Sequence, residues 1–169
     1  MLENKQTQDS YFSFKLSSVM FSLPVKYVRE VFEFEKITPI PNSLAYLKGV
    51  MNVRGNVVSI ADFRMLFGFE CSDDLKGTQI IIMEIPRAGG EKPFPLGIIA
   101  DSVDVVSPLN LISAESKAYG ITEDKAKFVS AVARRDDEFI LVLNPEKILE
   151  FIESDVSRAV DLLALGRQI

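Results

Sequence analysis

The chain has 169 residues, 47% hydrophobic and 25% charged, which is the composition of an ordinary globular domain. Its 24 acidic and 19 basic residues give a net charge of −5, and no basic run is longer than Arg134-Arg135. This balance excludes the electrostatic footprint of a nucleic-acid-binding protein. The absence of histidine excludes a Ser-His or Cys-His dyad, a histidine phosphorelay site and a zinc site built from cysteine and histidine.

The sequence carries no signal for export or for insertion into a membrane. No apolar run approaches the ~20 residues of a membrane-spanning helix, and the N-terminus lacks the basic-then-apolar order of a signal peptide. The single cysteine, Cys71, cannot form an intrachain disulfide, which fits a reducing compartment. We therefore expect a cytoplasmic protein without cofactor or metal, with a flexible lead over residues 1–10.

The first half of the chain is predicted to contain two β-hairpins. Each is a pair of apolar runs around a short polar break: residues 11–16 and 19–23 around Ser17-Ser18, and residues 46–53 and 56–60 around Arg54-Gly55. Glycine at position 55 permits a positive φ, which places Arg54 at the tip of a tight turn.

The segments beside these hairpins have signals of their own. Residues 25–31, after Pro24, are expected to form one or two helical turns. Residues 37–42 contain two prolines one position apart, which predicts an extended connection. After the second hairpin, Asp62 is expected to cap a short helix over residues 63–67 that stops at Gly68.

The second half is predicted to be rich in strands and to end in a helix. The expected strands are residues 78–85, 96–100, 103–106, 128–133 and 139–143. Residues 86–93 and the polar stretch 113–124 are expected to be loops. Asn144 suits a helix cap and Pro145 suits the first helical position, which predicts a helical segment over residues 145–169. The apolar residues that recur in it at helical spacing are Ile148, Leu149, Ile152, Val156, Val160 and Leu163.

A faint internal duplication runs through the chain. Residues 46–69 align without a gap with residues 128–151, and apolar, small and capping positions recur in the same order. Residues 23–28 align in a similar way with residues 98–103. Two similar strand-rich units in one chain argue for two small barrels packed together.

Several segments, in the right order, resemble the CheW-like domain family. The strongest is residues 49–64, with a glycine, an Asn-x-Arg-Gly turn, an apolar strand and an Asp-Phe-Arg cap. Val28-Arg29-Glu30-Val31, Ile37-Thr38-Pro39-Ile40-Pro41 and residues 96–103 match further segments of the family. The resemblance runs from about residue 11 to residue 151.

This resemblance implies a mainly β fold of two SH3-like, five-stranded barrels over a shared hydrophobic core, with short helices and a C-terminal helix. It implies one domain over residues 11–151, which the sequence pattern divides near residues 72–78. It also implies a non-enzymatic chemotaxis coupling adaptor. The implied partners are the regulatory domain of the chemotaxis histidine kinase and the cytoplasmic tip of a chemoreceptor, at membrane-associated receptor arrays.

Arg54 is the first candidate for binding a partner. A guanidinium at a hairpin tip offers forked donors to a carboxylate, and Arg54 matches the turn arginine that the family associates with coupling. Arg29 and Glu30 are further candidates, with a solvated polar face as the alternative. Gly49 and Gly55 belong to the same candidate surface, although backbone requirements explain them more simply.

The remaining candidates divide between interface and structure. Phe128 could be an apolar interface anchor, with burial in the core as the favoured alternative. Asp62 and Asn144 are expected to be structural caps, worth about 1 kcal/mol each. The core is expected to include Val28, Val50, Val57 and Ile60.

Two other kinds of function stay open at this point. An enzyme would need a mechanism based on carboxylates or lysine, and the sequence contains no glycine-rich phosphate loop. A small-ligand-binding β-barrel, or a specialised CheW-like paralogue outside motility, is compatible with the composition.

Overall fold

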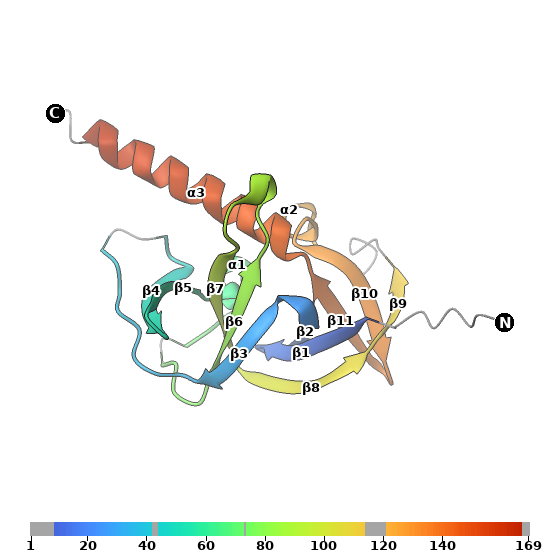
Figure 1. Cartoon of the computed structure of the whole chain (residues 1–169). Helices are drawn as coiled ribbons and strands as arrows, with labels where there is room; N and C mark the ends of the chain where they lie inside the picture. Colours follow the sequence, from blue (N-terminus) through green and yellow to red (C-terminus); the bar gives the residue numbers. More distant parts are fainter. Residues whose placement is uncertain (1–8, 42–43, 73, 114–120, 167–169) are drawn as a thin grey trace.

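The strands of the computed structural model form two sheets, which lie side by side beneath a long C-terminal helix (Figure 1). The structure describes residues 9–41, 44–72, 74–113 and 121–166. One sheet has six strands, in the order β8 (Ser102–Pro108), β1 (Ser10–Leu16), β2 (Val19–Pro24), β11 (Glu138–Leu143), β10 (Val129–Arg135) and β9 (Asn110–Ser113). The other has five, in the order β3 (Val28–Glu33), β6 (Gln79–Ile85), β7 (Phe94–Ala100), β5 (Asn56–Ala61) and β4 (Leu47–Val53).

The helices are few. Among the described residues, four of them are short: η1 (Val25–Tyr27), α1 (Phe63–Leu66), η2 (Ala88–Gly90) and α2 (Glu123–Ala126). The fifth is α3 (Pro145–Gly166). The mainly β class and the C-terminal helix are therefore confirmed, whereas the expectation of five strands in each unit is wrong for the six-stranded sheet.

Both sheets curl around an interior of their own. The edge strands β8 and β9 of the six-stranded sheet are joined by Leu109 alone, so its two edges must approach each other. In the five-stranded sheet, the chain beyond β3 returns to the opposite edge, where Thr38 and Val50 exchange two backbone hydrogen bonds of 2.9 Å. Such curling is what small barrels require, and the relation to SH3 folds stays a prediction.

Successive side chains of a strand point to opposite faces of its sheet, and the buried apolar side chains form three clusters. The interior of the six-stranded sheet contains Tyr11, Met20, Ala131, Ala133, Ile140 and Val142. The interior of the five-stranded sheet contains Met51, Val58, Ile60, Ile80, Ile82 and Ile99. Between the sheets lies the largest cluster, which draws on strands of both and on α3. Strand β6 is buried on both faces, because its alternate residues enter the inner cluster and this shared core.

Each of the two sheets combines strands that are distant in the sequence. Strands β1 and β2 join β8–β11, and β2 pairs in parallel with β11. Strands β6 and β7, which follow the expected division near residues 72–78, join β3–β5, and β7 pairs in parallel with β5. The sheets therefore do not separate at residues 72–78, because the N-terminal hairpin completes the later sheet.

The internal duplication is visible in the pairing itself. In one unit Ser59 lies opposite Leu96, and at the equivalent position of the other unit Leu141 lies opposite Phe21. The backbone N–H of Asp62 donates to the carbonyl of Tyr46 at 2.7 Å, and the equivalent bond joins Asn144 to Phe128 at 2.8 Å. The repeat in the sequence is thus a repeat of hairpin, cap and helix.

Some local predictions need correction. Only residues 25–27 of the expected helical turns over residues 25–31 are helical, because β3 pairs with β6 from Val28 onward. The expected loop over residues 113–124 includes the end of β9 and the start of α2. The lead before residue 9, the centre of that loop (114–120) and residues 167–169 lie outside the described residues.

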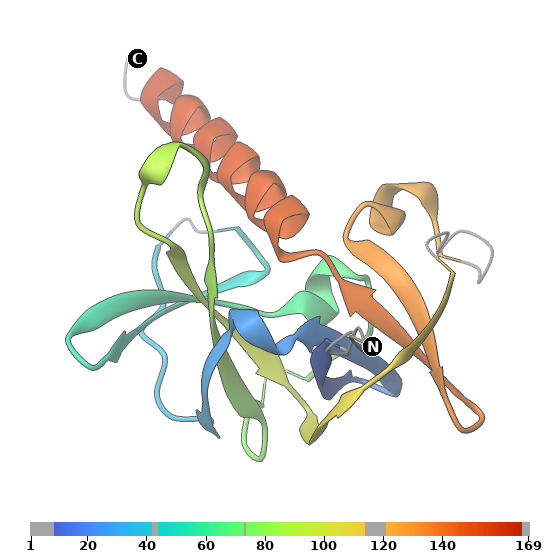
Figure 2. The same cartoon turned by 45° about the vertical axis from the view of Figure 1, so that its right-hand side comes forward.

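Helix α3 connects the two sheets. It leaves the six-stranded sheet after β11, and its buried residues Ile148, Leu149 and Ile152 enter the shared core as their spacing predicted. Its last turns run beyond both sheets in two views of the molecule (Figures 1 and 2). The side chains of Val156, Val160 and Leu163 lie outside those described. None of the helices in the described ranges is long and apolar enough to cross a membrane.

Candidate functional site

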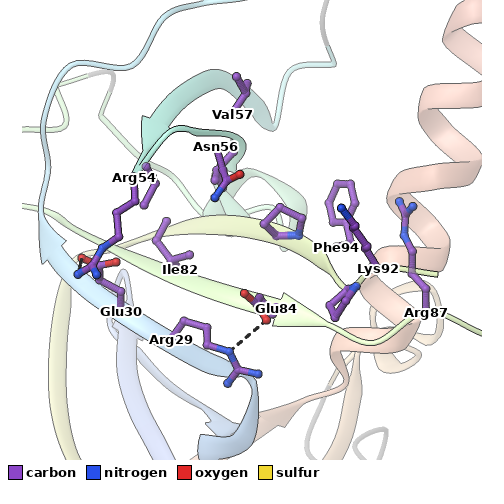
Figure 3. Close-up of a pocket in the computed structure, with 14 residues that line it drawn as sticks. Arg29, Glu30, Arg54, Asn56, Val57, Ile82, Glu84, Arg87, Lys92 and Phe94 are labelled. Carbon is purple, nitrogen blue, oxygen red and sulfur yellow. Dashed lines mark hydrogen bonds and ion pairs between the residues drawn. The ribbon is translucent and has the colours of Figure 1, made fainter. Parts of the chain in front are cut away.

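Three of the predicted binding residues, Arg54, Glu30 and Arg29, line one open groove of about 730 Å³. Its walls are β3, the β4–β5 hairpin and the loop between β6 and β7 (Figure 3). We call this surface the hairpin groove. Arg29 and Glu30 lie on β3 and Arg54 lies in the β4–β5 turn, and β3 and β4 are opposite edges of the sheet, so only the tertiary structure brings the three residues together.

The tip of the β4–β5 hairpin projects Arg54 into solvent. Arg54 and Gly55 both have positive φ, 51° and 85°, which is the conformation of a tight two-residue hairpin turn. The side chain of Asn52 supports the turn by accepting a hydrogen bond of 2.9 Å from the backbone N–H of Gly55. The Arg54 side chain is 81% exposed.

Across the groove, β3 presents charged side chains to this tip. Nη2 of Arg54 donates to Oε1 of Glu30 at 3.2 Å, and Nε of Arg29 donates to Oε2 of Glu84 on β6 at 3.2 Å. Both pairs are visible in Figure 3. Exposed ion pairs contribute at most about 1 kcal/mol, so either arginine can be redirected to a partner at little cost.

The far wall of the groove combines an aromatic ring with a cation. The guanidinium of Arg87 lies 4.8 Å from the ring centre of Phe94, a cation–π geometry. The same group donates to Glu153 of α3 at 2.7 Å. This wall is therefore tied to the C-terminal helix, and Figure 3 shows Arg87 beside that helix at its right-hand side.

The other candidate binding residues are not groove residues. Gly49 is buried, and a Cβ there would lie 2.1 Å from the carbonyl oxygen of Thr38, so its role is to permit the close approach of two strands. Gly55 has open space around it and serves the turn. Phe128 is only 1% exposed and packs edge-on against Phe67 and Phe151. Phe128 as an interface anchor is therefore wrong, because the shared core covers its ring.

Both predicted caps are present. Asn144 accepts a hydrogen bond of 3.2 Å from the N–H of Lys147, and Asp62 accepts one of 3.0 Å from the N–H of Arg64. Asp62 has a second role, since it also holds the buried guanidinium of Arg64 through two bonds of 3.0 and 2.9 Å. These hydrogen bonds raise the pKa of Arg64 above its ordinary value. Arg64 in turn donates to Asp101 at 2.9 Å, which joins α1 to the β7–β8 turn.

Sequence reasoning missed part of the groove. Val57 was expected in the core, yet the residue is 68% exposed and lines the groove. The signal was available: Val58 and Ile60 face inward, so the two-residue period of a strand turns Val57 outward. No local pattern predicted that Arg87 and Phe94 line the groove. Arg87 lies in the β6–β7 loop and Phe94 at the start of β7, and only the fold brings both to the groove wall.

The groove has the chemistry of a surface for recognising protein. It alternates arginines and glutamates with Val57, Phe94 and prolines, and interfaces are enriched in arginine and aromatic side chains. The described residues contain no group of three metal-ligating side chains. Fold and groove together define a mainly β protein with an open groove of mixed charge.

Comparison with known proteins identifies the family. The model of the CheW-like domain matches residues 10–153, and the chain therefore belongs to the CheW-like domain family, as its sequence resemblance predicted. It is 23% identical to the chemotaxis protein CheW of Treponema pallidum, over 80% of this chain and 79% of that one. It is 24% identical to the chemotaxis protein CheW of Thermotoga maritima, over 83% and 87%.

A solved structure agrees with this assignment. The scaffolding protein TtCheW from Thermoanaerobacter tengcongensis superposes with a TM-score of 0.70 and 26% identity. The match covers 85% of this chain and 89% of that one. The agreement therefore extends over both sheets and is not confined to one of them.

Proposed function

We propose that this protein is a non-enzymatic chemotaxis scaffold that links the cytoplasmic tips of chemoreceptors to the regulatory domain of the chemotaxis histidine kinase. Family membership supports the role, and so do the relatives, which are named as chemotaxis and scaffolding proteins. The observation that carries it is the hairpin groove, where Arg54, Glu30 and Arg29 converge on a solvent-open surface. A scaffold of this kind works in the cytoplasm, at receptor arrays on the membrane.

The mechanism would be positional. Two rigid sheets over one shared core hold the docking surfaces at a set separation, so movement of a bound receptor is transmitted to the bound kinase. A contact through a single docking surface is weak, and a receptor array strengthens such contacts through high effective concentration.

Calorimetric titration with the kinase regulatory domain tests the proposal. Arg54→Glu and Glu30→Arg should each weaken binding about tenfold or more, because each places a like charge against the partner. The double variant Glu30→Arg/Arg54→Glu keeps an ion pair across the groove but reverses its direction. If these residues contact the partner, the double variant stays weak; if they act only on each other, it recovers.

Lys147→Glu provides the control. Lys147 is exposed on the first turn of α3, outside the groove residues, and its charge reversal should leave binding unchanged. Saturable binding of the parent protein supports the scaffold role. A folded parent protein that does not bind the kinase domain or a receptor tip at high micromolar concentration would contradict it and favour the ligand-binding alternative.

A further inference from the structure

A second groove lies on the five-stranded sheet, between the β3–β4 connection and the loop that precedes β6, with a volume of about 580 Å³. Its floor is apolar and consists of Phe34, Ile37, Pro39 and Leu75. Phe34, Ile37 and Leu75 are half-buried and rest on the inner cluster of the sheet. The floor therefore has a packed core directly beneath it.

The wall of this groove is held at both ends by backbone hydrogen bonds. The N–H of Phe34 donates to the carbonyl of Thr78 at 3.0 Å, and Thr38 exchanges two bonds of 2.9 Å with Val50. Gly49 permits the second attachment, because any side chain there would collide with Thr38. The groove is thus formed in advance, and a ligand would not need to order it.

Positive charge surrounds the apolar floor. Lys36, Lys48 and Lys76 line the groove together with one acid, Glu35. Within the described residues, none of the three lysines forms an ion pair, whereas the arginines of the hairpin groove are all paired. This local excess of positive charge stands out on a chain with a net charge of −5. We call this surface the lysine groove.

We propose that the lysine groove docks an acidic segment of a partner protein, with one large apolar side chain of that segment on the floor. Unpaired lysines attract carboxylates and speed the encounter. The apolar floor supplies the short-range attraction that fixes the position of the segment. The lysine groove uses none of the residues that line the hairpin groove, so this inference goes beyond the proposed function and does not depend on it.

The test uses a short fluorescent peptide of aspartates around a single leucine, measured by fluorescence anisotropy and by backbone amide chemical shifts. We expect saturable binding that weakens with added salt, and shifts grouped over residues 34–38, 48 and 75–76. The same peptide with lysines in place of aspartates should not bind. Lys36→Glu/Lys76→Glu should weaken binding by about tenfold or more.

The matched control is Lys26→Glu/Lys147→Glu, which changes the net charge equally at exposed positions outside the lysine groove. Binding by this variant should stay within about twofold of the parent. The proposal is overturned if both double variants weaken binding equally, since long-range charge alone would then explain it. It is also overturned if the peptide does not bind, or if the shifts fall on the hairpin groove instead.

Discussion

Two glycines of the same hairpin have different physical reasons to be glycine. Gly49 has a φ of +146° and would place a Cβ 2.1 Å from the carbonyl oxygen of Thr38. Gly55 has a φ of +85° and nothing within 4 Å of a Cβ. Strain at Gly49 is therefore both conformational and steric, whereas strain at Gly55 is conformational only.

We expect Gly49→Ala to lower the free energy of unfolding by about 2–4 kcal/mol, because the Thr38 bridge must open or shift. Gly55→Ala should cost only about 1 kcal/mol. Urea unfolding of both variants, followed by circular dichroism, measures the difference. Equal losses in the two variants would show that the steric conflict at Thr38 is relieved without cost.

Arg64 shows how a single residue can join distant segments. It is 4% exposed and bonds to Asp62 and Asp101, while the other carboxylate oxygen of Asp101 accepts a bond of 2.6 Å from the N–H of Ser17. One guanidinium thereby connects α1, the β7–β8 turn and the N-terminal hairpin. The sequence predicted Asp62 as a cap, but the ion pair between Arg64 and Asp101 depends on a turn that is distant in the chain.

At the scale of elements, α3 is held to the five-stranded sheet by polar bonds around its buried face. Tyr27 donates to Glu146 at 2.5 Å, Tyr46 donates to Asp155 at 2.9 Å, and Arg87 donates to Glu153 at 2.7 Å. Burial raises the pKa of both phenols well above the ordinary value of 10, and the hydrogen bonds to carboxylates raise it further. The folded state therefore favours the neutral tyrosines.

This shift predicts a loss of stability in alkali. A folded pKa above the unfolded value means that the tyrosine contribution is complete below about pH 10 and disappears as the pH rises through the folded pKa. Tyr46→Phe should lower the free energy of unfolding by about 1–2 kcal/mol at pH 7. The variant should also lose less stability than the parent protein above pH 10, because one of the two tyrosines with a raised pKa is gone.

Urea unfolding between pH 7 and pH 11.5, with tyrosinate absorbance recorded in parallel, measures both effects. Tyr27→Phe is a second, independent case, since its acceptor is Glu146 and not Asp155. If the free energy of unfolding falls equally above pH 10 in the parent protein and in both variants, these tyrosine hydroxyls do not cause the loss of stability in alkali.

The two equivalent hairpins share the conformation of the first turn residue but not its chemistry. Arg54 and Asp136 occupy equivalent positions of the duplication and have nearly the same φ, 51° and 53°. Val57 and Phe139 are also equivalent, and both are large exposed apolar residues. The repeat therefore preserves the positive φ of the first turn residue and an outward apolar position, while the charge at the tip is reversed.

At the scale of the whole molecule, each sheet combines strands from both halves of the chain, which makes the two sheets one cooperative unit. Strands β1 and β2 lie in one sheet with β8–β11, and the shared core contains residues from both sheets and from α3. Neither sheet can form without strands from the other side of residues 72–78. The loss of either sheet also exposes the core of the other.

We therefore expect a single unfolding transition for the whole chain. Circular dichroism and tyrosine fluorescence should give coincident urea curves, and the calorimetric and van't Hoff enthalpies should agree. A fragment ending at residue 77 should not fold, since it lacks β8 and β11, which flank the β1–β2 hairpin, and β6, which pairs with β3. Two separated transitions, or a folded fragment, would contradict this coupling.

Local pattern was enough to predict the hairpins, the caps and the helix start. A tight turn with Gly55, a cap with Asp62 or Asn144, and strand alternation all depend on neighbours within a few residues. The duplication and the family resemblance extended these local signals to the class of fold. Arg54 was predicted at a hairpin tip for the same reason, since turn geometry alone places it there.

The tertiary structure decided what depends on contacts between distant residues. Only pairing with β6 makes Val28–Glu33 a strand, and only that strand brings Arg29 and Glu30 beside Arg54. Burial of Phe128 and exposure of Val57 depend in the same way on which face another element covers. Sequence alone determined the repeated units and their turns, whereas the assembly of strands across the chain determined the sheets, the core and the grooves.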